Sequence, residues 1–279
     1  MKAELIDLND YVYTGEGANG SSYNHKDNPA VMLKLYNKNA PYEIIVNELE
    51  LAQKVYELRI PTPKPGDFVT DGAGRYGIRF ERVPDKVSYS RAVGDEPRRV
   101  EEFAREFARM CRQLHATHLP KDSFKNVKDV NLRLLQENPF FTPEEKVKVA
   151  EFIRQAPDGD TAIHGDLQFS NLIMSHGKSY FIDLGDFAYG APEFDLGMVL
   201  LCCRYDGEDF VREVFHMEPA TADEFWRYFV KGYFGESADP DEMDRRLRPY
   251  AGLKVLIIER NAGVHFPQFH ALLEEVVRG

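Results

Sequence analysis

The chain has 279 residues, of which 43% are hydrophobic, 29% charged and 12% aromatic. This composition is close to that of folded globular proteins and excludes disordered chains, collagen-like repeats and small disulfide-rich domains. The 35 Lys and Arg residues against 46 Asp and Glu residues give a formal net charge of −11, which argues against a nucleic-acid partner.

No apolar segment is long enough to cross a membrane, because the longest, 196–203, is far shorter than the roughly 20 residues that a spanning helix needs. Residues 1–7 contain acids where a signal peptide has its apolar segment. The three cysteines, two of them adjacent, lie in apolar, helix-like surroundings and are expected to be buried thiols. We therefore expect no membrane partner and a reducing, cytoplasmic location.

The N-terminal third combines strand and helix patterns. Residues 11–13 and 31–36 predict strands, with turn residues at 27–29 between them. Apolar residues at helical spacing predict a helix over 43–58, which a proline cluster ends. Residues 78–83 alternate as in a strand. Because Pro84 follows, we expect an N-terminal lobe over 1–83 and a C-terminal lobe over 84–279.

The rest of the chain is mainly helical in pattern. An amphipathic helix is predicted over 100–115, and helix starts are predicted at Thr142, Thr221 and Asp239, each with a glutamate three positions later. Residues 172–174 and 180–182 predict a short β pair. The expected fold is therefore α+β, with a small β-rich lobe and a larger helical lobe.

Acidic residues are concentrated in the segment 158–223, which has thirteen acids but only the bases Lys178, Arg204 and Arg212, a net charge of −10. Such a segment is either a solvated acidic face or a surface that attracts cations.

A glycine-rich motif follows the first predicted strand. Gly15, Gly17 and Gly20 fit G-x-G-x-x-G, a pattern that lets the backbone approach a phosphate. A turn and a strand follow the motif, whereas a Rossmann dinucleotide site requires a helix there. The motif is therefore either a hairpin tip that covers a nucleotide or a structural glycine turn.

Lys34 lies within the strand predicted over 31–36. Taken alone it is a surface lysine, but it would bind the α- and β-phosphates of a nucleotide if an acid of the next helix held it in place. Glu48, near the middle of that helix, is the acid that we favour. Glu43 and Glu50 are the alternatives.

The strongest motif is His164-Gly165-Asp166, followed by Asn171 and, at the end of the predicted β pair, by Asp183. The pair brings the three polar groups Asp166, Asn171 and Asp183 to one end. Magnesium prefers one or two protein oxygen ligands in addition to phosphate oxygens, which Asn171 and Asp183 can supply while Asp166 acts as a base. In the alternative interpretation these residues only form turns.

In this order, these residues resemble the motifs of the protein-kinase-like superfamily, and residues 164–166 and 182–185 resemble its aminoglycoside phosphotransferase and choline kinase branch. The resemblance covers about residues 12–197. It implies a two-lobed kinase fold that uses ATP and Mg²⁺ to phosphorylate a hydroxyl of a small molecule. It makes Asp166 the catalytic aspartate, Asn171 and Asp183 the magnesium ligands, and His164 and Asp195 supports of the catalytic loop. The ATP-binding residues that it implies are Gly15, Gly17, Asn19, Gly20, Ser21, Ser22, Lys34 and Glu48, with Glu81 and Val83 as the hinge that binds adenine.

Two departures from protein kinases point to a small-molecule acceptor. Gly165 stands where protein kinases have an arginine, and only seven residues separate Asp183 from Ala191, too few for an activation segment. The acidic segment would suit a cationic acceptor such as an aminoglycoside, an aminosugar or a choline-like amine. The alternative is a nucleotide-binding pseudokinase with a regulatory or scaffold role. Neither the oligomeric state nor the residues of the acceptor pocket can be predicted.

Overall fold

The computed structural model describes residues 1–17 and 19–278. Ala18, within the glycine motif, lies outside the described residues. The chain divides into two compact units, which we call the sheet unit (Met1–Val87 with Ile173–Gly185) and the helical unit (Ser88–Leu172 with Asp186–Gly279). The α+β fold class is confirmed, whereas the lobe boundary after residue 83 stays a prediction.

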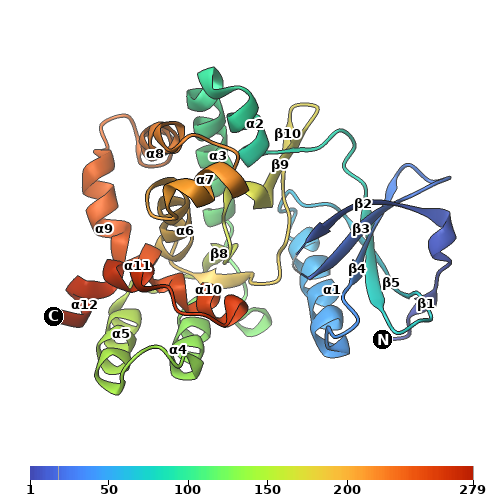
Figure 1. Cartoon of the computed structure of the whole chain (residues 1–279), viewed down its shortest axis with the longest axis horizontal. Coiled ribbons are helices and arrows are strands. Elements are labelled where there is room, and N and C mark those ends of the chain that lie inside the picture. Colours follow the sequence, from blue (N-terminus) through green and yellow to red (C-terminus); the bar gives the residue numbers. More distant parts are fainter. Residues whose placement is uncertain (18, 279) are drawn as a thin grey trace. The chain divides into compact units, whose positions relative to one another are not determined.

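The sheet unit is built on six strands in the order β1-β5-β6-β4-β3-β2 (Figure 1). All neighbouring pairs are antiparallel except β1 with β5. The strands are β1 (Glu4–Leu5), β2 (Tyr11–Gly17), β3 (Gly20–His25), β4 (Val31–Tyr36), β5 (Pro65–Thr70) and β6 (Tyr76–Glu81). The three predicted strands are confirmed as β2, β4 and β6. The other strands were missed, because β3 is rich in Ser and Asn and β5 begins with a proline, which are turn signals.

Helix α1 (Tyr42–Glu57) confirms the predicted helix and covers one face of this sheet. Strand β4 alternates between the two faces. Leu33 and Leu35 pack on one side with Val69, whereas Tyr36 packs on the other side with Ile45 of α1. The alternation therefore places Lys34 on the α1 side of the sheet.

The predicted short β pair is confirmed as β9 (Leu172–Ser175) and β10 (Lys178–Phe181). They belong to a three-stranded sheet in the order β10-β9-β7, in which β7 is Val87–Ser88. Within the sheet unit, the Phe181 N–H donates to Pro61 O over 2.8 Å. This bond anchors the strand that precedes Asp183.

The helical unit contains eleven described helices and one β pair, β8 (Thr161–Ile163) with β11 (Ala188–Gly190) (Figure 1). The helices are α2 (Tyr89–Asp95), α3 (Val100–His115), α4 (Val127–Glu137), α5 (Pro143–Gln155), α6 (Glu193–Arg204), α7 (Glu208–Val214), α8 (Pro219–Phe234), α9 (Pro240–Leu253), α10 (Val255–Ala262), α11 (Pro267–His270) and α12 (Glu274–Arg278). Short 3₁₀ turns occur in both units, at Leu8–Asp10, Pro97–Arg99, Lys121–Ser123, Phe169–Asn171 and Ala271–Leu273.

The helix predictions are confirmed with one exception. Helix α3 has the predicted bounds, Thr142 forms a capping box with Glu145, and Asp239 caps α9. The predicted start at Thr221 is wrong. Helix α8 begins two residues earlier, at Pro219, because proline is favoured at the first helical position and its fixed φ already suits the helix.

Among the described residues, no helix is both long and apolar enough to span a membrane. The three cysteines are free, buried thiols, as predicted. Burial raises the pKa of Cys111 well above its ordinary value, so this thiol stays protonated and acts as an apolar packing group.

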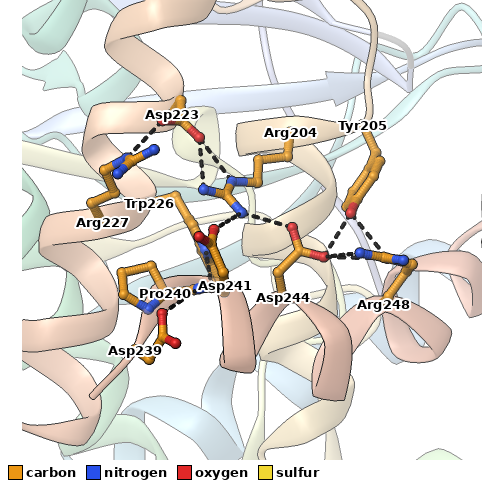
Figure 2. A network of polar contacts seen from close by, with 10 residues as sticks. All are labelled: Arg204, Tyr205, Asp223, Trp226, Arg227, Asp239, Pro240, Asp241, Asp244 and Arg248. Atoms are coloured by element: carbon orange, nitrogen blue, oxygen red, sulfur yellow. Dashed lines mark hydrogen bonds and ion pairs between the residues drawn. The ribbon is translucent and has the colours of Figure 1, made fainter. Parts of the chain in front are cut away.

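A network of ion pairs fastens three helices of the helical unit together (Figure 2). Arg204, at the end of α6, pairs with Asp223 of α8 at 2.8 Å and with Asp244 of α9 at 2.8 Å. Tyr205 also donates its hydroxyl to Asp244 over 2.6 Å. The Asp244 side chain is only 6% exposed, so it depends on these donors for compensation of its charge.

We predict that Arg204→Ala lowers the free energy of unfolding by about 2 kcal/mol, because it removes one charged donor from the buried Asp244 carboxylate, which keeps Arg248 at 2.8 Å. Arg212→Ala is the matched control, since Arg212 pairs only with exposed acids such as Glu208, and it should change stability by less than about 1 kcal/mol. Urea denaturation of the two variants measures the difference. Equal losses of stability would contradict a structural role of the network.

Candidate active site

In the sheet unit, Lys34 lies between two carboxylates that are distant in sequence. Its Nζ is 2.7 Å from Glu48 Oε1 and 3.5 Å from Asp183 Oδ1, and it lies 5.0 Å from the centre of the Tyr36 ring. Burial alone would lower the pKa of Lys34, but the charges of Asp183 and Glu48 outweigh burial and raise it. The ammonium group is therefore charged and held in a fixed position.

The structure selects Glu48 among the three glutamates weighed for this helix. Ile45 and Leu49 of α1 are buried against the sheet, and because residues three or four positions apart share a helix face, Glu48 points toward the same side. Its competitors Glu43 and Glu50 are exposed.

The glycine motif forms the end of the β2–β3 hairpin, as the hairpin interpretation predicts. Gly17 pairs with Gly20, and Ser21 and Ser22 of β3 pair with Leu35 and Lys34 of β4. A Cβ at Gly20 would lie 2.3 Å from Leu35 O, so packing requires glycine there.

Packing does not explain the other two glycines of the motif. A Cβ at Gly15 would meet no described atom within 4 Å, and the nearest to one at Gly17 is Gly20 O at 3.9 Å. Asn19 accepts a hydrogen bond from the Asn37 N–H through its carbonyl oxygen, over 3.0 Å. The strand around the two glycines is thus open to the approach of a ligand.

The expected hinge residues lie at the end of β6. The Glu81 N–H donates to Lys64 O over 2.8 Å. Val83 is half-buried and follows the strand by two residues.

Asp183 has the left-handed backbone conformation, with φ of 59°. Such a conformation is uncommon for a residue other than glycine and is often found at functional sites. The carboxylate is 47% exposed, so it can bind a metal ion without first losing a buried partner.

In the helical unit, Asp166 and Asn171 contact each other. Asn171 Nδ2 donates to Asp166 Oδ2 over 2.8 Å and to the Asp166 carbonyl over 2.9 Å, and Gln168 Nε2 donates to the same Oδ2 over 3.0 Å. Among the described residues, both side-chain bonds to Asp166 use Oδ2 and not Oδ1. Both Asn171 bonds use the amide nitrogen and not the amide oxygen. An amide oxygen is a ligand type that suits magnesium.

Asp195 holds the loop that carries Asp166. Its fully buried carboxylate accepts hydrogen bonds from the His164 N–H over 2.7 Å and from the Gly165 N–H over 2.9 Å. His115 Nε2 lies 3.2 Å from the same carboxylate. Burial would raise the pKa of Asp195, but the bond from His115 and the charge of Lys254 outweigh burial and lower it. His164 itself is fully buried.

Gly165 has φ of 88°, and a Cβ there would lie 2.3 Å from Asp186 O. The glycine of the His-Gly-Asp motif is therefore required by a close backbone approach. This requirement explains why arginine cannot stand at this position.

Lys254, which sequence reasoning missed, lies beneath the same loop. It is buried, and its Nζ donates to Gly165 O over 2.8 Å. Burial lowers the pKa of Lys254, although the charges of Asp195, Asp166 and Asp186 act to raise it. No motif surrounds this residue in the sequence, so only the fold could reveal it.

The structure thus forms two sets of predicted residues, one in each unit. Lys34, Glu48 and Asp183 belong to the sheet unit, and Asp166 and Asn171 belong to the helical unit. The model of the phosphotransferase enzyme family matches residues 15–229, which span both sets. The chain belongs to this family.

The solved structures that this phosphotransferase resembles include two aminoglycoside phosphotransferases and one choline/ethanolamine kinase family protein. A thermostable mutant of aminoglycoside phosphotransferase APH(4)-Ia, with AMP-PNP and hygromycin B, has a TM-score of 0.66 and 14% identity over 96% of this chain and 93% of that one. APH(3'')-Id from Streptomyces rimosus, with ADP and streptomycin, has a TM-score of 0.60 and 22% identity over 90% and 99%. A choline/ethanolamine kinase family protein from Mesorhizobium loti has a TM-score of 0.59 and 16% identity over 96% and 92%.

At these identities the likeness shows the fold, which is protein-kinase-like. The comparison with curated proteins finds no significant match.

Asp206 is a second residue of this phosphotransferase that sequence reasoning missed. It follows α6 and is half-buried. The pKa of Asp206 is raised to about 6, chiefly by burial, while a hydrogen bond with Cys202 acts to lower it and the negative charge of Asp166 acts to raise it. The charge of Asp166 therefore acts on Asp206.

We predict that Asp206→Asn stabilises the protein at pH 8 by up to about 3 kcal/mol, because a shift of about two pKa units is worth that much. The raised pKa means that the folded state binds this proton more tightly than the unfolded state, so the wild type regains the stability as pH falls through about 6. The gap between variant and wild type should therefore narrow toward pH 5.

Urea denaturation between pH 8 and pH 5 measures this gap. Asp209→Asn is the matched control, since the Asp209 side chain is 96% exposed, and it should show no gap that depends on pH. A gap for Asp206→Asn that stays constant with pH would contradict the predicted shift.

Proposed function

We propose that this chain is an ATP-dependent kinase that transfers the γ-phosphate to a hydroxyl group of a small molecule. The observation that carries the proposal is the position of Lys34, whose ammonium is 2.7 Å from Glu48 and 3.5 Å from Asp183. Phosphoryl transfer depends mainly on positioning and charge neutralisation. A fixed cation next to an exposed carboxylate is suited to both tasks.

In this proposal the sheet unit binds the nucleotide. Lys34 binds the α- and β-phosphates, and the backbone at Gly15, Gly17, Asn19 and Gly20 approaches the phosphates with Ser21 and Ser22. Glu81 and Val83 bind adenine through their backbone. Asp183 and Asn171 are the proposed ligands of Mg²⁺, which would neutralise phosphate charge when bound.

Asp166 is the proposed base. Its Oδ1 accepts a hydrogen bond from the acceptor hydroxyl, whose oxygen forms a bond to the γ-phosphorus while the bond from that phosphorus to the β,γ-bridging oxygen breaks. ADP leaves with the electron pair of the broken bond, and the hydroxyl proton passes to Asp166 and then to water. Asp195, His164 and Lys254 act as positioning residues, because they contact the loop and not the reacting atoms.

We further propose a cationic acceptor. Two of the similar structures hold the aminoglycosides hygromycin B and streptomycin, and Asp206 adds a carboxyl group whose pKa is raised in part by the negative charge of Asp166. The composition of the segment 158–223 adds little, because acids such as Glu193 pair with bases outside it, here Arg246 at 2.8 Å. The charge next to the catalytic loop is therefore the better argument.

The alternative is a pseudokinase that binds the nucleotide without transferring phosphate. The two proposals differ in turnover and not in nucleotide binding. The arrangement of Asp166 favours the enzyme, because a scaffold has no need for a carboxylate oriented by both Asn171 and Gln168.

We predict that Asp166→Asn lowers Mg²⁺-dependent ADP formation by about 10²- to 10⁴-fold, the usual contribution of a general base, with nucleotide affinity and melting temperature unchanged. ADP release is measured with a panel of aminoglycosides, choline and ethanolamine, and with water alone as the acceptor. Asp209→Asn should behave as the wild type. An unchanged rate in Asp166→Asn would contradict its role, and a wild type that binds ATP without any turnover would favour the pseudokinase.

A further inference from the structure

A cluster of one glutamate and two histidines lies in the C-terminal part of the helical unit, outside the residues assigned to phosphate transfer. Glu259 belongs to α10 and its side chain is fully buried. His265 follows this helix and His270 ends α11. Gly263, with φ of 68°, ends α10 and turns the chain so that both histidines return to Glu259.

The ligand atoms of these three side chains converge. His265 Nδ1 is 2.8 Å and His270 Nε2 is 3.0 Å from Glu259 Oε1, and one ligand atom from each residue lies within 4.8 Å of the other two. We propose that Glu259, His265 and His270 form a zinc site that fastens the C-terminal segment of the chain to the helical unit.

The hydrogen bonding around Glu259 supports a metal. Its Oε1 faces three nitrogen donors, because the Phe266 N–H also lies 2.8 Å away, whereas a carboxylate oxygen has two lone pairs. A neutral imidazole can bind a metal through the nitrogen that faces Glu259 and keep its proton on the other nitrogen. Zinc would therefore relieve the crowding at this oxygen.

The separations of the ligand atoms and the hydrogen bond from Asn138 to Glu259 also suit zinc. Zinc binds nitrogen and oxygen ligands at about 2.0–2.2 Å with tetrahedral geometry, which sets neighbouring ligand atoms about 3.4 Å apart. The present separations of 2.8 and 3.0 Å would have to widen by only about 0.5 Å. Asn138 Nδ2 donates to Glu259 Oε2 over 2.8 Å, the kind of bond that orients a metal-binding carboxylate.

A fourth ligand position is available in the neighbouring cavity of about 310 Å³, whose lining includes His265, His270, Glu145 and Glu274. A water molecule there would complete a tetrahedral set. Two imidazoles and one carboxylate favour zinc as the bound ion, because magnesium and calcium prefer sites made of oxygen ligands alone.

Zinc binding to the full chain, treated with EDTA and free of nucleotide, tests this proposal. Competition with a chromogenic chelator should show one saturable zinc site per chain, and zinc should raise the melting temperature. His265→Asn and His270→Asn should each weaken zinc binding by at least 10-fold. His118→Asn is the matched control, because His118 is exposed and contacts the single carboxylate of Asp160, and it should bind zinc as the wild type does.

Two measurements keep the test decisive. Asp183→Asn should leave this zinc affinity unchanged, which separates the site from the proposed magnesium ligands. X-ray absorption of the zinc-loaded wild type should show two imidazole nitrogens at about 2.0–2.1 Å, and this result does not depend on the folding of any variant. The proposal is overturned by the absence of saturable zinc binding, by zinc binding that both histidine variants retain, or by a stability that depends on pH but not on zinc.

Discussion

The conformation of the loop that carries Asp166 depends on one fully buried carboxylate, that of Asp195. A buried charge without partners costs several kcal/mol, so the folded chain must supply donors, and two of these are the backbone N–H groups of His164 and Gly165. The loop conformation that satisfies Asp195 also brings Gly165 against Asp186. The position of Asp166 follows from this constraint, and Lys254 beneath the loop offsets the accumulated negative charge.

The sheet unit also contains a charged side chain in a largely buried position, but here the charge is positive. Lys34 lies on the helix-covered side of β4 because Leu33 and Leu35 occupy the other side, and burial there would disfavour its charge. Glu48 and Asp183 compensate for burial. Each unit therefore carries a charged group that its own packing holds in place, and this rigidity is what phosphoryl transfer requires of a protein.

The sequence predicts most reliably those parts of the candidate site whose residues lie close together in the chain. The His-Gly-Asp loop, the glycine hairpin and the short β pair before Asp183 follow from local patterns, and the α+β fold follows from their order. Lys254 could not be predicted, because its role arises from packing of a distant helix and no local pattern marks it. Glu48 could be chosen from three glutamates only by its side of the helix, and Thr221 failed as a helix start because Pro219 offers a better one.

Hydrogen exchange in the presence of Mg²⁺ and AMP-PNP tests most directly whether both sets of residues serve one nucleotide. The account predicts slower amide exchange at residues 15–22 and 181–185 of the sheet unit and also at residues 164–171 of the helical unit. In Asp183→Asn, the part of this protection that requires magnesium should disappear from both units. Protection confined to a single unit, or protection that does not depend on magnesium, would contradict the account.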